Sequence, residues 1–241
     1  MFISPVQTYN PAYRGNNREV FNKSGKFLYK TTTYFFREDL NWTCLAELLG
    51  EKYKTVQKVN VLNHACSNGQ EPYTLAVKLI QILGKEAKKF FPIQAKDIDF
   101  DNIESANRGR LGIKLNEMYR INHYTKNQLT SFFTLGKPAN PNNDLVLIPK
   151  ENIKSKVNFS QTDILKDTSE KLPDNTVILC RNFWPYLAPA EREQLASNLY
   201  QNIGDNSLII TGDFDYRSNT PDLLKSRGFV EIGMNNVYIK R

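Results

Sequence analysis

Strand-like and helix-like segments alternate along most of this chain, and that order constrains the fold more than any other feature. Short apolar and β-branched runs predict strands at residues 59–63, 93–98, 157–159, 176–180 and 208–211. Helical spacing of apolar residues predicts helices at 40–49, 71–83, 101–108, 189–203 and 221–226. Repeated strand-then-helix order favours a mostly parallel sheet with helices on both faces. We therefore expect a doubly wound α/β domain.

Glycine and asparagine mark several expected boundaries. Gly50 is expected to end the helix at 40–49, and Gly204 the helix at 189–203, because glycine is common just past a helix C-terminus. In the tail, two β-rich runs flank Asn235 and Asn236, which is a hairpin signal. This hairpin would add one antiparallel strand to the sheet.

Two parts of the chain depart from the alternation. Residues 1–29 are rich in Asn, Tyr, Lys and Arg without a sustained period, so we expect an irregular N-terminal arm before one domain at 30–241. Between residues 109 and 156 the alternation of strands and helices is interrupted by a polar stretch with Pro138 and Pro141, which is longer than an ordinary connection. We expect an inserted subdomain there.

Composition excludes several classes of protein. A chain of 241 residues with 40% hydrophobic residues can bury one sizeable core, and it contains no apolar run long enough for a membrane-spanning helix. The formal net charge of +7 favours an anionic partner, such as nucleic acid, an acidic protein surface or an anionic ligand. We therefore expect a globular protein without membrane insertion.

Cysteine and histidine usage bears on compartment and metal binding. The three cysteines lack CxxC spacing, and the two histidines, His64 and His123, lie far apart. Neither a disulfide framework nor a metal site is predicted. The N-terminus lacks a signal-peptide or transit pattern, so a cytoplasmic location is expected.

The loop after the first predicted strand, residues 65–74 (ACSNGQEPYT), is a candidate ligand site, because ligands of doubly wound sheets bind at the carboxyl ends of the strands. Gly69 is its only glycine, which disfavours the phosphate-binding loops that need several. The carboxylate of Glu71 instead suits a ligand with an ammonium or sulfonium charge. The alternative is a plain turn in which Glu71 is a first-turn helix charge.

Two further strand ends carry aspartates. Asp97 lies where an acidic residue can accept from both ribose hydroxyls. The alternative for Asp97, which this feature alone favours, is a helix N-cap, a role that Asp99 fills at least as well. Asp163 and Ile164 would suit an adenine, with the aspartate accepting from the amino group and the isoleucine covering the ring. Ordinary turn chemistry explains Asp163 equally well.

Polar and aromatic residues directly follow the buried strand at 176–180. Arg181, Asn182 and Tyr186 in this position are unusual for packing alone, which favours a functional role. Upstream, residues 33–38 (TYFFRE) combine an aromatic cluster with Arg37. The planar fork of arginine matches a carboxylate, although Arg37 as a solvated charge beside core aromatics is the alternative.

Assembled in order, these segments resemble the CheR family, the S-adenosylmethionine-dependent methyltransferases that esterify glutamates of bacterial chemotaxis receptors. The resemblance covers residues 30–215 or so. It is carried by residues 33–38, 65–74, 97–99 (DID), 163–165 (DIL) and 180–182 (CRN), with Tyr186.

The resemblance implies a class I (Rossmann-like) methyltransferase fold: a seven-stranded, mostly parallel sheet with a terminal antiparallel hairpin, and a small β-subdomain at about 109–156. It implies S-adenosylmethionine as the cofactor and a protein glutamate as the methyl acceptor, on an acidic protein such as a chemoreceptor-like one. Arg37 and Tyr186 would be the catalytic pair. The implied cofactor-binding residues are Thr33, Arg37, Ala65, Glu71 (amino-acid end), Asp97 (ribose), Asp163 and Ile164 (adenine), Arg181 and Asn182.

The sequence departs from the family pattern at several points. The matching motifs begin near residue 30, which leaves no room for the family's usual N-terminal helical domain. Ala65 replaces a customary glycine, Gln70 replaces the first acid of a Glu-Glu pair, and residues 213–215 (DFD) stand where His-Ser-Glu is common. Two alternatives therefore stay open: a catalytically divergent cofactor-binding regulatory module, and a methyltransferase with another acceptor. A nucleic-acid substrate is not expected, because the Asn/Asp-Pro-Pro-Tyr/Phe motif of amino methyltransferases is absent after the fourth strand.

Overall fold

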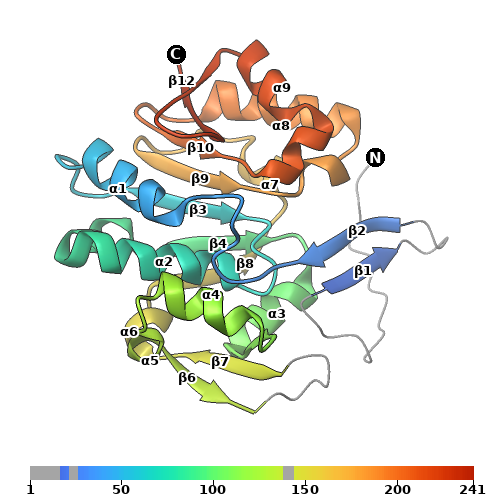
Figure 1. The fold of residues 1–241 in the computed structure, drawn as a ribbon. Helices are drawn as coiled ribbons and strands as arrows, with labels where there is room; N and C mark the ends of the chain where they lie inside the picture. Colours follow the sequence, from blue (N-terminus) through green and yellow to red (C-terminus); the bar gives the residue numbers. More distant parts are fainter. Residues whose placement is uncertain (1–16, 22–26, 138–143) are drawn as a thin grey trace.

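The computed structural model describes residues 17–21, 27–137 and 144–241, and its centre is a seven-stranded sheet in the order β11-β12-β10-β9-β3-β4-β8 (Figure 1). The strands β10, β9, β3, β4 and β8 are parallel, whereas β12 is antiparallel to both of its neighbours. The predicted mostly parallel sheet with a terminal antiparallel hairpin is confirmed. The strands are β3 (Asn60–His64), β4 (Ile93–Asp97), β8 (Val157–Gln161), β9 (Thr176–Cys180), β10 (Leu208–Ile210), β11 (Phe229–Glu231) and β12 (Val237–Lys240).

Both faces of this sheet are covered because alternate residues of its strands enter two different cores. In β9, Val177 and Leu179 pack into one core, and Ile178 and Cys180 into the other. The first core takes the apolar faces of α1 (Trp42–Lys52) and α2 (Gln70–Leu83), and the second those of α8 (Pro189–Asn202) and α9 (Thr220–Ser226). Shorter helices, α3 (Phe100–Arg108) and α7 (Ile164–Asp167), follow β4 and β8.

The expected role of Gly50 is wrong, whereas Gly204 does lie just past the end of its helix. Helix α1 continues through Gly50 to Lys52, and a Cβ atom at Gly50 would overlap the side chain of Leu83 in α2. Helix α8 ends at Asn202, and a Cβ at Gly204 would lie 2.5 Å from the backbone of Pro173. Both glycines permit close approach of neighbouring segments instead of ending a helix in the left-handed conformation.

The expectation of an irregular lead-in over residues 1–29 is wrong for residues 17–21 and 27–29. Strand β1 (Asn17–Phe21) pairs with β2 (Phe27–Thr32) in an antiparallel hairpin. Strand β2 leads directly into residues 33–38, so the hairpin precedes the segment that carries Arg37. Residues 1–16 and 22–26 lie outside the described part of the chain.

A separate three-stranded antiparallel sheet occupies the expected insertion, at some distance from the main sheet (Figure 1). Its strands are β5 (Leu111–Ile113), β6 (Phe133–Gly136) and β7 (Leu145–Pro149), accompanied by α4 (Glu117–Tyr124), α5 (Leu129–Phe132) and α6 (Glu151–Lys154). Arg120 of α4 donates from Nε to the carbonyl of Phe35 at 3.0 Å. The insertion therefore contacts the segment that carries Arg37. Pro138 and Pro141 lie outside the described residues.

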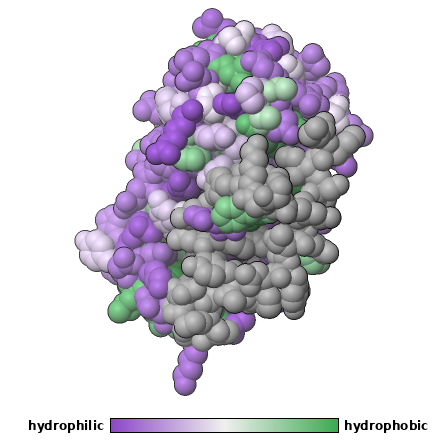
Figure 2. Space-filling model, turned by 90° about the vertical axis from the view of Figure 1, so that its right-hand side faces the viewer, coloured by the Kyte–Doolittle hydropathy of each residue, from purple (hydrophilic) through white to green (hydrophobic). Residues whose placement is uncertain are grey.

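The parallel strands point toward the side of the molecule that faces the viewer in Figure 2. On the part of this face that the structure describes, the surface is mainly hydrophilic, with small, separate apolar patches. Among the described helices, none has both the length and the apolar character needed to cross a bilayer.

Candidate active site

The side chains singled out from the sequence follow the carboxyl ends of the parallel strands. Glu71 lies in the first turn of α2 after β3, Asp97 ends β4, and Asp163 follows β8. Arg181 and Asn182 follow β9 directly. Because parallel strands end at the same edge of a sheet, this topology gathers them along one edge, as expected for a ligand site of this fold.

A buried ion pair joins two of these residues. Arg181 donates from Nη1 to Oε2 of Glu71 at 2.5 Å, and Asn63 donates from Nδ2 to the other Glu71 oxygen at 2.8 Å. The Arg181 side chain is fully buried, and its guanidinium lies 4.9 Å from the centre of the Trp42 ring. The two charges are therefore desolvated and held in place by hydrogen bonds and by an aromatic face.

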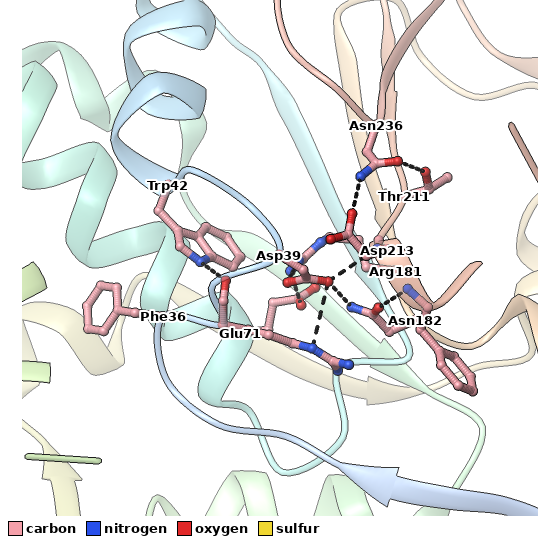
Figure 3. Close-up of polar contacts among 12 residues, drawn as sticks. Phe36, Asp39, Trp42, Glu71, Arg181, Asn182, Thr211, Asp213 and Asn236 are labelled. Atoms are coloured by element: carbon pink, nitrogen blue, oxygen red, sulfur yellow. Dashed lines mark hydrogen bonds and ion pairs between the residues drawn. The ribbon is translucent and has the colours of Figure 1, made fainter. Parts of the chain in front are cut away.

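Asp39 extends this ion pair toward two other loops (Figure 3). Its Oδ1 accepts from Nη2 of Arg181 at 2.5 Å, and its Oδ2 accepts from Nδ2 of Asn182 at 3.0 Å. The backbone N–H of Asp213 points to the same Oδ2 at 3.4 Å, and Nε of Arg37 lies 3.7 Å from it. Asp39 thereby connects the segment before α1 with the loops after β9 and β10.

Asn182 is held in an unusual conformation by a buried carboxylate. Its φ of 63° is left-handed, a region that asparagine tolerates better than most residues. Its backbone N–H donates to Asp215 at 2.8 Å, as does that of Gly212, and Trp184 N–H donates to the other Asp215 oxygen at 3.2 Å. Burial raises the pKa of Asp215 to about 7, despite these three donors. Asp215 thus sets the direction of the loop that presents Asn182.

The loop after β3 is fastened to the end of β4 by Asp97. Ser67 N–H donates to Asp97 Oδ2 at 2.7 Å, and Asp99 N–H donates to Asp97 Oδ1 at 2.9 Å. The cap of α3 is Asp99, whose side chain accepts from the N–H of Asp101, so the cap alternative for Asp97 is wrong. Within the loop, Ala65 has a left-handed φ of 54°. The loop and the predicted ribose-binding residue form one unit.

Asp163 is a helix cap, as the turn alternative suggested. Its side chain accepts from the N–H of Leu165 at 2.9 Å at the start of α7, and Ile164 is almost fully buried. A carboxylate has further acceptor capacity beyond one cap bond, so the cap role leaves room for a ligand amino group. The adenine-binding role of both residues stays a prediction.

The structure also shows the neighbours of three further predicted site residues, Arg37, Tyr186 and Thr33. The Arg37 guanidinium lies 5.5 Å from the centre of the Tyr34 ring, and its side chain keeps 23% exposure. Tyr186 belongs to a 3-10 turn after β9, with its ring 5.4 Å from that of Phe214. Thr33 is buried directly after β2. The pairing of Arg37 with Tyr186 in catalysis stays a prediction.

Several buried polar atoms beside this edge lack a hydrogen-bond partner. They are Oγ of Ser67, both amide atoms of Gln70, Oδ1 of Asn63 and Nε of Arg181. Unpaired buried polar groups are costly, so a polar ligand that bonds some of them would be favoured here. Together with the carboxylates of Glu71 and Asp97, this set fits a ligand with an ammonium or sulfonium charge and hydroxyl groups, as S-adenosylmethionine has.

Two residues of the site were not predicted from the sequence. Asp39 directly follows the 33–38 motif in a run of charged residues, and the two side chains that donate hydrogen bonds to it lie more than 140 positions away. Asp215 appears in the sequence only as part of a departure from the family pattern. Two acidic residues, Asp213 and Asp215, follow the buried strand β10 and were the available signal for Asp215, whereas local sequence holds none for Asp39.

A family model and several curated proteins match most of the chain. Residues 31–229 match the family model described as "CheR methyltransferase, SAM binding domain". The chain is 23% identical over 201 residues to chemotaxis protein methyltransferase 2 of Vibrio cholerae, covering 82% of this chain and 66% of that protein. It is 26% identical over 196 residues to the chemotaxis protein methyltransferase of Salmonella typhimurium, covering 81% and 64%. The chain thus spans about two thirds of the length of these curated relatives.

Among solved structures, a TehB-like SAM-dependent methyltransferase from Corynebacterium glutamicum is 12% identical with a TM-score of 0.43, covering 84% of this chain and 89% of that one. A likeness at this level carries no weight in the assignment, which depends on the sheet order and the family match. The match covers the insertion and every predicted site residue. It also covers the strands of the main sheet that precede β11 in the chain, and it ends at the first residue of β11. The chain therefore belongs to the CheR methyltransferase family, with S-adenosylmethionine as its cofactor.

Proposed function

We propose that this protein transfers a methyl group from S-adenosylmethionine to a carboxylate oxygen, and that the acceptor is a glutamate side chain of another protein. The observation that carries this proposal is the contrast between two arginines of the site. The Arg181 side chain has no exposed surface and is paired with two carboxylates. Arg37 borders the same cluster with 23% of its side chain exposed, so it can pair with a carboxylate from outside.

The chemistry suits these side chains. When bound, the cofactor supplies an electrophilic methyl on a sulfonium; an acceptor oxygen forms the new C–O bond as the C–S bond breaks, which leaves a methyl ester and a thioether. A glutamate is already ionised at neutral pH, so the protein needs no strong base. Its task is to align the carboxylate and exclude water. In this proposal Arg37 holds the carboxylate through its planar fork, and Tyr186 orients it by a hydrogen bond.

The class of acceptor is supported by charge and by the relatives. The chain carries a net charge of +7, which favours encounter with an acidic protein. The curated relatives are named chemotaxis protein methyltransferases. A chemoreceptor-like protein in the cytoplasm is the acceptor that best fits both observations, and this assignment is part of the proposal.

A base-lability assay tests the bond that is formed. The protein is incubated with methyl-labelled S-adenosylmethionine and a panel of acidic proteins, including cytoplasmic parts of chemoreceptors, and the labelled product is then treated with alkali. A carboxyl ester releases volatile methanol, which is the expected result. Alkali-stable label would indicate N-methylation and contradict the proposed acceptor. Tight cofactor binding without labelling of any protein would favour a regulatory module.

A further inference from the structure

We infer that Asp39 is a positioning residue that arranges Arg181 and Asn182 to receive the amino-acid end of the cofactor. Asp39 lies one position beyond the motif at 33–38, so the family resemblance does not assign it. Its side chain is only 12% exposed, and it stands where three parts of the chain converge (Figure 3). This inference concerns the cofactor site and is independent of the methyl acceptor.

The Asp39 carboxylate holds side chains from neighbouring loops in fixed directions. Arg181 and Asn182 each donate to a different oxygen of Asp39, at 2.5 and 3.0 Å, so one carboxylate fixes the directions of two adjacent side chains. The N–H of Asp213 approaches the second oxygen at 3.4 Å, and the side chain of Asp213 is held by Asn236 at 2.8 Å. Charge-assisted hydrogen bonds of this kind are stronger and more directional than neutral ones. The loops after β9 and β10 are therefore aligned through Asp39.

Asp39 also affects the charge balance around Glu71. Arg181 is buried with Glu71 on Nη1 and Asp39 on Nη2. Within this buried trio, one positive charge is shared between two carboxylates, and the second positive charge of the cluster, Arg37, lies beside Asp39, with its Nε 3.7 Å from Asp39 Oδ2. If Asp39 lost its charge, Arg181 would neutralise Glu71, which is the carboxylate proposed to face the ammonium of the cofactor. Asp39 thereby keeps Glu71 attractive to a cation.

The strand order divides the site into two halves. The partners of Asp39 follow β9 and β10, and Glu71 follows β3, whereas Asp97 and Asp163 follow β4 and β8 on the other side of β3. The proposed ribose and adenine contacts thus belong to a different half of the sheet edge. Loss of Asp39 should weaken the recognition of the amino-acid end and spare the nucleoside end.

Two ligands that differ only in the amino-acid end test this inference. S-adenosylhomocysteine carries the amino acid, whereas 5′-methylthioadenosine keeps the adenosine and the thioether but lacks it. Calorimetry on the full chain should show that Asp39→Asn weakens S-adenosylhomocysteine binding by about tenfold or more and leaves 5′-methylthioadenosine binding unchanged. The matched control is Glu38→Gln, which removes the same charge one position away on an exposed residue and should change neither affinity.

A second variant distinguishes a positioning role of Asp39 from a general folding defect. Asp39→Glu keeps the charge and displaces the carboxylate by one methylene, and it should also weaken S-adenosylhomocysteine selectively. Equal losses for both ligands in the two variants would assign Asp39 a merely structural role and overturn the inference. Unchanged binding of both ligands would overturn it as well. Because no acceptor is present, neither outcome depends on whether the protein methylates glutamate.

Discussion

Arg181 and Glu71 are 110 positions apart in the chain, yet their side chains are joined at 2.5 Å in the interior of the site. Burial opposes a charged guanidinium, but Glu71 and Asp39 outweigh burial and raise the pKa of Arg181. Arg181 therefore stays charged, and the pair fixes the start of α2 against the end of β9. Glu71 and Asp39 depend on the charge of Arg181, because a buried carboxylate without a counter-charge is strongly disfavoured.

Replacing Arg181 with methionine should destabilise the fold strongly. Arg181→Met removes the buried counter-charge that Glu71 and Asp39 share, and the expected loss in the free energy of unfolding is roughly 3–5 kcal/mol. Urea unfolding measures it. The control is Arg227→Met, whose ion pair with Glu193 is exposed and should contribute less than about 1 kcal/mol. Equal losses in both variants would contradict the buried-pair account.

Replacing Arg37 with alanine should affect turnover far more than cofactor affinity. If Arg37 holds the acceptor carboxylate, Arg37→Ala should lower kcat by about 10²-fold, because an aligning charge at the reacting group is lost. Calorimetry with S-adenosylhomocysteine should show a much smaller change. Arg227→Ala, at the end of α9, serves as the control. Comparable losses in turnover and in cofactor affinity would place Arg37 at the cofactor instead of at the acceptor.

The titration of Asp215 should lower the free energy of unfolding as the pH rises. Burial raises its pKa from the ordinary 3.8 to about 7, so the folded state binds the proton more tightly than the unfolded state. Its contribution to stability is therefore lost as pH rises from about 4 to about 7. Asparagine does not titrate, so the free energy of unfolding of Asp215→Asn relative to the unaltered protein should rise over this window.

The pH dependence is measured by urea unfolding at several pH values. Asp205→Asn, at an exposed position, is the matched control and should show no such trend. A constant difference between Asp215→Asn and the unaltered protein, or one that falls with pH, would contradict the assignment.

Replacing Ala65 with glycine should raise the free energy of unfolding, whereas replacing an alanine of a helix with glycine should lower it. Its φ of 54° is left-handed and its side chain is exposed, so Ala65→Gly relieves backbone strain without losing packing. The expected gain in the free energy of unfolding is about 0.5–1 kcal/mol. Ala190→Gly in helix α8 should instead lose about that amount, as helix propensity predicts. A loss at both positions would show that Ala65 is not strained.

Much of the fold could be predicted from hydrophobic patterns, and the misses have physical causes. Strand β9 was predicted with its bounds because 176–180 is fully buried and purely apolar in its centre. The role of Gly50 was missed because a glycine that ends a helix and a glycine that lets α1 approach Leu83 look the same in one sequence. The hairpin before Thr33 was missed because its strands, at 17–21 and 27–32, show no clear alternation.

The candidate site was predictable only in part. Glu71, Asp97 and Arg181 follow strands, so topology brings them to one edge without any knowledge of their contacts. Asp39 follows no strand, and its role depends on partners distant in sequence, which local patterns cannot reveal. Asp97 and Asp163 each had a local alternative, a helix cap for Asp97 and ordinary turn chemistry for Asp163, and the structure shows that only Asp163 is a cap.

A crystal structure of the protein with S-adenosylhomocysteine tests the central claim most directly. The ligand should lie along the carboxyl edge of the parallel strands, with its amino-acid end at Glu71 and Asn182, its ribose at Asp97 and its adenine at Asp163 and Ile164. A ligand bound elsewhere, or one whose ribose and amino-acid ends do not reach Asp97 and Glu71 together, would contradict the account.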